Sequence, residues 1–173
     1  MDPYVRVCRN LGRAGVRHLI VGAFGVNLYA RDVGQVITTA DLDLLIPARL
    51  TSLVKALKTL RRLRFKLEAG GEPLPDLDPV VLKGVLRSRA NVRAFRKGAQ
   101  VDLALKIAGG QFGRFWKRRR RFIVDGVQLQ VGSLADLIRS KQMAGRAKDR
   151  LFLEAFRSVL KDLLQRESHR GAR

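Results

Sequence analysis

Apolar residues recur every three or four positions in five segments of the chain, and this spacing predicts amphipathic helices. Thr51 is the expected N-cap of one helix, and Ser133 with Asp136 forms a capping-box pattern at the start of another. Gly145 is expected to end that helix, since glycine favours helix C-termini. The predicted helices are residues 3–14, 23–31, 51–60, 133–143 and a last helix that includes residues 151–163.

Six short apolar runs predict β-strands. Lys97-Gly98 and Asp125-Gly126 each lie between two of these runs, which is typical of tight hairpin turns. Residues 69–79 are rich in glycine and proline and are expected to form a loop. The predicted strands are residues 18–21, 41–46, 92–95, 99–105, 122–124 and 127–131.

The alternation of strands with helices indicates an α/β fold with a mixed sheet and helices packed on it. A length of 173 residues suits one domain with a substantial core. We expect residues 1–132 to form that core, residues 133–165 a C-terminal helical pair, and residues 166–173 a flexible basic tail.

One predicted strand carries two acidic residues. Asp41 and Asp43 alternate with leucines, so both carboxylates project from one face, about 6–7 Å apart. Two buried like charges are costly unless cations neutralise them, and Mg²⁺ prefers carboxylate oxygens. The strand therefore predicts a metal site. The alternative is a strand end with two solvated carboxylates.

The net charge of the chain limits the kinds of partner that we expect. Lysine and arginine number 35 against 15 acidic residues, which gives a formal net charge of +20. Such an excess favours polyanions such as nucleic acid. The basic residues cluster, for example in 61–66 and 117–121, although a general preference for arginine at solvated positions is the alternative explanation.

Membrane and disulfide chemistry are not expected. No apolar run approaches the roughly 18–20 residues of a membrane span. Cys8 is the only cysteine, which excludes an internal disulfide. A cytoplasmic protein without a membrane partner is the simplest interpretation.

Three further features accompany the acidic strand. A strand ends at Gly22-Ala23 directly before a helix, and backbone N–H groups in such a turn can approach phosphate oxygens. Asp102 lies alone in an apolar strand, and three carboxylates on adjacent strands can hold two metal ions about 3.5–4 Å apart. Lys141, Arg146 and Lys148 lie between the last helices and can neutralise phosphate charge.

Each of these features also has a simpler interpretation. Gly22 can merely end a strand, Asp102 can pair with a neighbouring arginine, and residues 141–148 can form a solvated helix junction. Phe112 and Trp116, beside the basic run, can stack on bases or anchor their segment to the core.

Gly22-Ala23 followed by Thr-Ala-Asp-Leu-Asp at residues 39–43 resembles the nucleotidyltransferase superfamily of the DNA polymerase β type. In that family a Gly-Gly or Gly-Ser turn precedes an Asp-x-Asp motif. Residues 133–141 and 145–149 resemble small bacterial stand-alone members related to abortive-infection (AbiEii-like) toxins. The resemblance covers roughly residues 17–160.

The resemblance implies Mg²⁺- or Mn²⁺-dependent transfer of a nucleoside monophosphate from an NTP to an acceptor hydroxyl. It implies that Asp41, Asp43 and Asp102 are the catalytic and metal-binding residues. Independently of the resemblance, a carboxylate such as that of Asp102 can take the hydroxyl proton. The basic charge makes RNA or tRNA a reasonable acceptor, and the toxin-like members imply an antitoxin protein as a partner. The nucleotide-binding residues implied are Gly22, Ala23, Thr39, Lys141, Arg146 and Lys148.

Two positions depart from the family pattern. Ala23 replaces a glycine or serine, and alanine lacks the hydroxyl that would contact phosphate. Ile37 stands where an arginine is frequent. The alternative function is therefore a catalytically silent member of this fold that binds nucleic acid or a partner protein through its basic surface.

Overall fold

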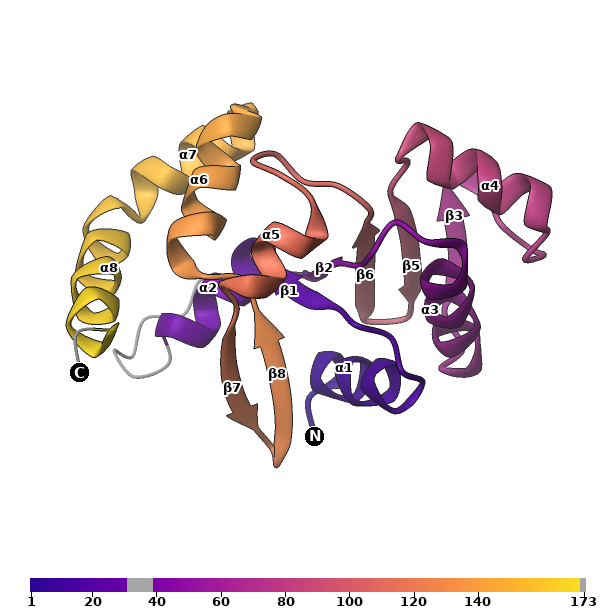
Figure 1. Ribbon diagram of the computed structural model, residues 1–173, viewed down its shortest axis with the longest axis horizontal. Helices are drawn as coiled ribbons and strands as arrows, with labels where there is room; N and C mark the ends of the chain where they lie inside the picture. The colour runs from indigo at the N-terminus through magenta and orange to yellow at the C-terminus, as the bar shows by residue number, and fades with distance from the viewer. Residues whose placement is uncertain (31–38, 172–173) are drawn as a thin grey trace.

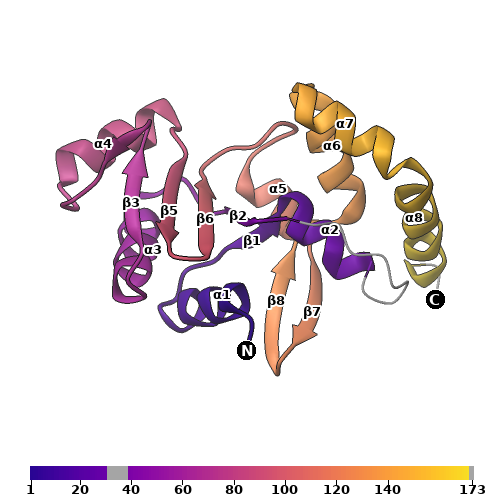
Figure 2. The ribbon, with the colours of Figure 1, turned by 180° about the vertical axis from the view of Figure 1, so that it is seen from behind.

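The computed structural model describes residues 1–30 and 39–171, with side chains described through residue 169. In this part of the chain, eight strands form one sheet in the order β4-β3-β5-β6-β2-β1-β8-β7, with helices packed around it (Figures 1 and 2). The strands are β1 (Leu19–Val21), β2 (Asp41–Leu45), β3 (Lys66–Ala69), β4 (Glu72–Pro73), β5 (Val92–Arg96), β6 (Ala99–Ala104), β7 (Arg120–Val124) and β8 (Val127–Val131). The helices are α1 (Pro3–Arg13), α2 (Gly22–Ala30), α3 (Leu50–Arg62), α4 (Pro79–Ser88), α5 (Phe112–Lys117), α6 (Leu134–Ala144), α7 (Ala147–Ala155) and α8 (Arg157–Gly171).

The sheet is mixed, as the sequence predicts. β2 pairs with β6 in parallel and β1 pairs with β8 in parallel, whereas the other neighbours are antiparallel. Parallel neighbours need a long connection, and the 53 residues between Leu45 and Ala99 include α3, β3, β4, α4 and β5. The α/β fold class is thereby confirmed.

In the half of the sheet that contains β2, β5 and β6, one face is covered by the rest of the protein and the other is open to solvent. Along β2, β5 and β6, residues alternate between fully buried and partly or largely exposed positions. Alternate side chains of a strand point to opposite faces, so this pattern marks one covered and one open face. Leu42, Val101 and Ala94 lie on the covered face with no exposed surface, and α3 lies beside this half of the sheet (Figures 1 and 2).

The last helices lie at the other end of the sheet (Figure 1). α2 follows β1 directly and contacts β1, β2 and α6, while α6 in turn contacts α7. Ser133 caps α6 by accepting a hydrogen bond from the Asp136 amide, which confirms the predicted N-cap, and its hydroxyl donates to Asp136 Oδ2. Gly145 adopts a left-handed conformation at the C-cap, as expected of a helix-ending glycine.

Several predicted elements differ from the structure. The predicted final helix is two helices, because the chain leaves helical geometry at Phe156 between α7 and α8. α3 begins one residue earlier than predicted, and its N-cap is Arg49 without a side-chain hydrogen bond, so the prediction of Thr51 as the cap is wrong. The predicted loop of residues 69–79 contains β4, and its last residue starts α4.

Three further segments were not predicted, and two predictions lie partly outside the described residues. β3, α4 and α5 are absent from the predicted elements, although Asp78 caps α4 through hydrogen bonds from the Val80 and Val81 amides. Arg31, the last residue of the predicted second helix, and Ile37 lie outside the described residues. α8 continues to Gly171, through most of the segment for which the sequence predicts a tail.

None of the helices within residues 1–30 and 39–171 combines the length and the apolar character that crossing a membrane requires.

Candidate active site

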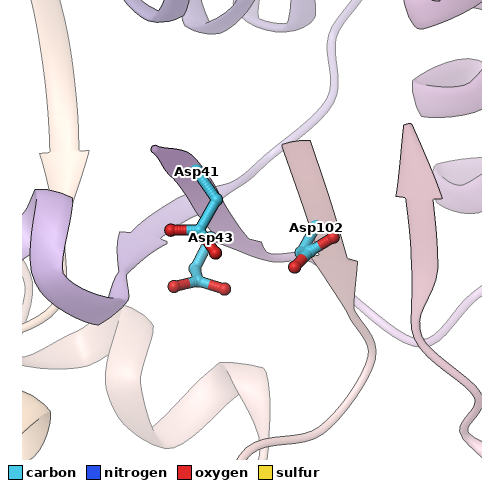
Figure 3. Close-up of side chains that lie close together, drawn as sticks. All are labelled: Asp41, Asp43 and Asp102. Carbon is cyan, nitrogen blue, oxygen red and sulfur yellow. The ribbon is translucent and has the colours of Figure 1, made fainter. Parts of the chain in front are cut away.

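Three aspartates meet on the open face of the sheet. Asp41 and Asp43 come from β2, and Asp102 comes from β6 directly beside Asp43 in the parallel pairing. Each offers a carboxylate oxygen, and these three oxygens lie within 4.8 Å of one another. Figure 3 shows the three side chains projecting into the same space from the two neighbouring strands. The chain therefore gathers the acidic set that its sequence pattern predicts.

Neighbouring side chains hold two of these carboxylates in place. Thr39 Oγ1 donates a 2.8 Å hydrogen bond to Asp41 Oδ1. Gln100 Nε2 donates to both Asp102 oxygens, at 3.3 and 3.2 Å. Arg93, beside Asp102 on β5, places Nε 3.5 Å from Asp102 Oδ1. Asp102 thus belongs to the acidic cluster and pairs with an arginine, so the structure contains both arrangements that the sequence allows.

Asp43 is the most perturbed member of the cluster. Burial raises the pKa of its carboxyl from 3.8 to about 6, with further contributions from Asp41 and Asp102, while Lys141 and Lys148 act in the opposite direction. A carboxyl group in this position is stabilised by an added cation or proton. The donor set suits a hard divalent ion, because such ions bind clustered carboxylate oxygens. The three aspartates therefore fit Mg²⁺ or Mn²⁺.

Gly22 makes room for the Asp43 carboxylate. Its φ of +66° lies in the left-handed region, and a Cβ built there would stand 2.0 Å from Asp43 Oδ2. Any side chain at residue 22 would therefore displace the carboxylate as well as strain the backbone. This close approach gives Gly22 a role beyond ending a strand: it lets the first turn of α2 lie against the acidic cluster.

The aspartates line a cavity of about 590 Å³. Its sheet wall consists of residues from β1, β2, β5 and β6 and from the segments that follow, and its helical wall comes from α6 and α7. Four carboxylates and five basic side chains line it: Asp41, Asp43, Asp102, Asp149, Arg93, Lys106, Lys141, Arg146 and Lys148. A cavity with acidic groups on one wall and cations on the other suits an anion that binds together with metal ions.

Asp149 organises the helical wall. Its carboxylate is buried and accepts hydrogen bonds from Arg146 Nε at 2.6 Å and from Lys141 Nζ at 3.3 Å. Burial alone would raise the pKa of Asp149, but the hydrogen bonds from Arg146 and Lys141 outweigh it and lower the pKa. Lys141 Nζ also lies 4.3 Å from the centroid of the Phe152 ring. One buried acid thus fixes two of the three predicted basic residues beside the cavity.

The structure brings most of the predicted site residues to this one cavity. Gly22, Ala23, the three aspartates, Lys141, Arg146 and Lys148 all line it. Thr39 reaches the site through its hydrogen bond to Asp41. Whether each residue binds nucleotide or metal remains a prediction, since the geometry fixes position and not role.

Three polar residues that line the sheet side are not among the predicted site residues: Asn91, Arg93 and Lys106. The signal for Arg93 was present, because the Lys97-Gly98 hairpin pairs Arg96 with Ala99 and so sets Arg93 opposite Asp102. The signal for Lys106 is the period of two along the chain from Asp102 through Ala104.

The two aromatic residues beside the basic run lie elsewhere. Phe112 is buried, and its ring stacks on that of Trp116 with centroids 5.2 Å apart. The Arg119 guanidinium lies 4.0 Å from the Trp116 ring centroid. These contacts favour the interpretation that the pair anchors its segment to the core.

Comparison with solved structures shows a similarity that extends over most of this chain. No protein-family model and no curated protein matches the sequence. Among solved structures, the chain is similar to a protein of Thermotoga maritima described as a "putative nucleotidyltransferase", with a TM-score of 0.53 and 14% sequence identity. The match covers 90% of this chain and 92% of that one. At this identity the likeness shows a shared fold alone, and activity has to be argued from the site.

Proposed function

We propose that this chain transfers a nucleoside monophosphate from a nucleoside triphosphate to an acceptor hydroxyl. The observation that carries the proposal is the set of three carboxylates within 4.8 Å, on neighbouring strands that face basic residues across one cavity. An acidic cluster alone has many explanations. An acidic cluster opposite an organised basic wall, in a fold shared with a nucleotidyltransferase-like protein, favours phosphoryl chemistry.

The aspartates are proposed to hold the divalent ions. Asp41, Asp43 and Asp102 would bind Mg²⁺ or Mn²⁺, which when bound neutralises phosphate charge and acts as a Lewis acid on the phosphoryl group. The raised pKa of Asp43 is a reason for this assignment, because a cation relieves the repulsion that raises it.

The basic wall is proposed to bind the triphosphate. Lys141 and Arg146 are positioned by Asp149, and Lys148 acts electrostatically on Asp43 across the cavity. Such preorganised cations stabilise charge that develops on a leaving pyrophosphate. Gly22 and Ala23 border the same space at the start of α2, where helix amides favour anions.

The chemical step is a displacement at the α-phosphorus. The acceptor oxygen forms a bond to that phosphorus, the bond to the bridging oxygen breaks, and pyrophosphate leaves with the electron pair. Asp102 is proposed to take the hydroxyl proton, because its carboxylate lies in the acidic set and borders the sheet side of the cavity, where Arg93 and Gln100 contact it. RNA or tRNA is the proposed acceptor, from the net charge of +20. A toxin role with a cognate antitoxin, implied by the resemblance to abortive-infection toxins, depends on this activity.

One residue favours a second candidate. Ala23 lines the cavity but has no hydroxyl to offer a phosphate, which supports a catalytically silent protein that binds nucleic acid through its basic surface. The complete aspartate set supports the enzyme.

Incubation with each labelled NTP, Mg²⁺ and total RNA separates the two candidates. The enzyme predicts label on RNA with wild-type protein, loss of label with Asp41→Asn, and unchanged labelling with Asp162→Asn, an exposed control on α8. RNA binding without label transfer by the wild type would support the silent alternative, and label transfer gained by Ala23→Ser would then identify the missing hydroxyl as the cause.

A further inference from the structure

We propose that the open face of β6, β5 and β3 binds the acceptor as a single strand of nucleic acid, with a base stacked on Phe95 and a phosphate on Arg93. This inference rests on the proposed function for the identity of the strand as acceptor. It rests on separate residues for the binding itself.

The register of the sheet places this face directly beside the aspartates. One row across the strands runs from Asp43 through Asp102 and Arg93 to Glu68. The next row of the same face contains Gln100, Phe95 and Lys66. Since neighbouring strands lie about 4.8 Å apart, Arg93 is one strand from Asp102, and Phe95 lies diagonally next to it.

The face is open to solvent. Leu67, Ala94 and Val101 point to the covered side and are buried. The residues between them are partly or largely exposed, and the Arg93 side chain keeps 56% of its surface accessible. A strand of nucleic acid can therefore lie on this face without displacing the core. Figure 2 shows β3, β5 and β6 side by side at the end of the sheet away from α6 to α8.

Phe95 is the unusual residue of this surface. It is half-buried in the sheet, yet within residues 1–30 and 39–171 it belongs neither to the hydrophobic core nor to the residues that pack against the core. An aromatic ring on the wet face of a sheet offers a flat surface to an unstacked base, and stacking tolerates any base.

Two further lysines lie near this path, one beside the ring and one at the cavity. Lys66 lies in the same row as Phe95 and is exposed, and Lys106 lines the cavity beyond Asp102. In the described part of the chain, neither lysine forms an ion pair. Arg93 pairs with Asp102 at 3.5 Å, and its accessible guanidinium can exchange that carboxylate for two phosphate oxygens. Glu68 bears a negative charge farther along the row, so the phosphate contact belongs at Arg93.

The two walls of the cavity would then bind different substrates. The helical wall, organised by Asp149, suits the triphosphate. The sheet wall leads from Asp102 to Arg93 and Phe95 without crossing the helical wall. An acceptor that approaches along the sheet would bring its terminal hydroxyl to Asp102, the proposed proton acceptor.

The inference is tested by RNA binding measured without NTP and without metal. Fluorescence anisotropy of an end-labelled, unstructured RNA oligonucleotide reports affinity even if no transfer occurs. Phe95→Ala is expected to weaken binding roughly tenfold, since base stacking on aromatic side chains has effects of that order. Arg93→Ala is expected to weaken binding and to reduce the slope of log affinity against log salt by about one.

Matched variants control for folding and for general charge. Phe95→Tyr keeps a stacking ring and should bind as the wild type does. Ile123→Ala removes a more exposed apolar side chain from β7, where the residue is 77% accessible, and should leave affinity unchanged. Duplex RNA of the same length should bind without dependence on residue 95, because its bases are not free to stack.

The outcomes separate this inference from the proposed function. RNA affinity that depends on Phe95 and Arg93 supports the binding face, even if the wild type transfers no label and the proposed function fails. Label transfer by the wild type, with RNA affinity and acceptor KM unchanged in Phe95→Ala and Arg93→Ala, overturns the binding face and leaves the proposed function intact. Equal loss of duplex and single-strand binding in Phe95→Ala also overturns it, because stacking would then not be the cause.

Discussion

Asp43 and Asp149 line the same cavity from opposite walls, and their surroundings affect them in opposite ways. Asp149 is buried between Arg146 and Lys141, whose hydrogen bonds lower its pKa despite burial. Asp43 is partly buried beside two other aspartates, and its pKa rises to about 6. The negative charge of Asp149 is neutralised by two cations of the fold itself. The charge of Asp43 is neutralised only by a proton or an added cation. This difference separates an acid that builds the site from one that binds a ligand.

The strongest test of that difference removes the negative charge of Asp43. Asp43→Asn is expected to reduce label transfer by at least about 10³-fold, because a metal ion supplies several kcal/mol of transition-state stabilisation. The same variant should unfold at the same or a higher urea concentration than the wild type in EDTA, since a repelled charge is removed. A parallel loss of activity and stability would show that Asp43 supports the fold.

Asp149→Asn should behave in the opposite manner. The Lys141 side chain is only 17% accessible and would lose its carboxylate partner. Leaving such a group without its partner costs about 2–3 kcal/mol, so the midpoint of urea denaturation should fall with or without Mg²⁺. An unchanged midpoint, with NTP affinity reduced, would contradict the structural role of Asp149.

A smaller effect concerns the pH dependence of stability. The folded-state pKa of Asp43 lies above the ordinary value of 3.8, so the folded chain binds more protons than the unfolded chain between pH 4 and 6. Its contribution to stability is therefore present below pH 4 and is lost as the pH rises through about 6. In EDTA, the wild type should lose about 2 kcal/mol relative to Asp43→Asn between these limits, and Mg²⁺ at pH 7 should restore it. Urea denaturation at several pH values measures this difference, and parallel curves for the two proteins would contradict it.

The smallest expected effect on stability comes from Gly22. Gly22→Ala and Gly98→Ala both place a side chain at positive φ, which costs about 1–2 kcal/mol each. A Cβ at Gly98 has no heavy atom within 4 Å, whereas one at Gly22 meets Asp43. Only Gly22→Ala should therefore weaken Mn²⁺ binding, by about tenfold in a calorimetric titration. Equal Mn²⁺ affinity in both variants would separate Gly22 from the acidic cluster.

Local pattern was enough to predict the elements that build the acidic wall. The alternation in residues 41–46 identified Asp41 and Asp43 as neighbours on one face, and the Lys97-Gly98 turn identified the hairpin that contains Asp102. The parallel pairing of β2 with β6 joins residues far apart in the sequence, and no local signal sets its register. The pairing itself was not predicted, and the family resemblance implied only that Asp102 joins Asp41 and Asp43.

Other features were not predictable for different physical reasons. The apolar spacing continues through Phe156, where α7 gives way to α8 without glycine or proline, so no local signal marks the break between these two helices, which both contact α6. For α4, the signal existed in Asp78-Pro79, an N-cap followed by a proline at the first helical position. The surrounding prolines and glycines concealed it. The burial of Asp149 between Lys141 and Arg146 depends on how α6 packs against α7, which no local pattern sets.

The pairing of Asp43 with Asp102 has a consequence for how errors of folding appear. A shift of β6 by one residue along β2 would turn Asp102 toward the apolar layer and bring Val101 or Leu103 to the wet side. Misaligned molecules would therefore bury a charge and lack the third acid at once, so they are both unstable and inert. In this chain, the side chain that the reaction is proposed to need, Asp102, also disfavours the wrong alignment of β6 on β2.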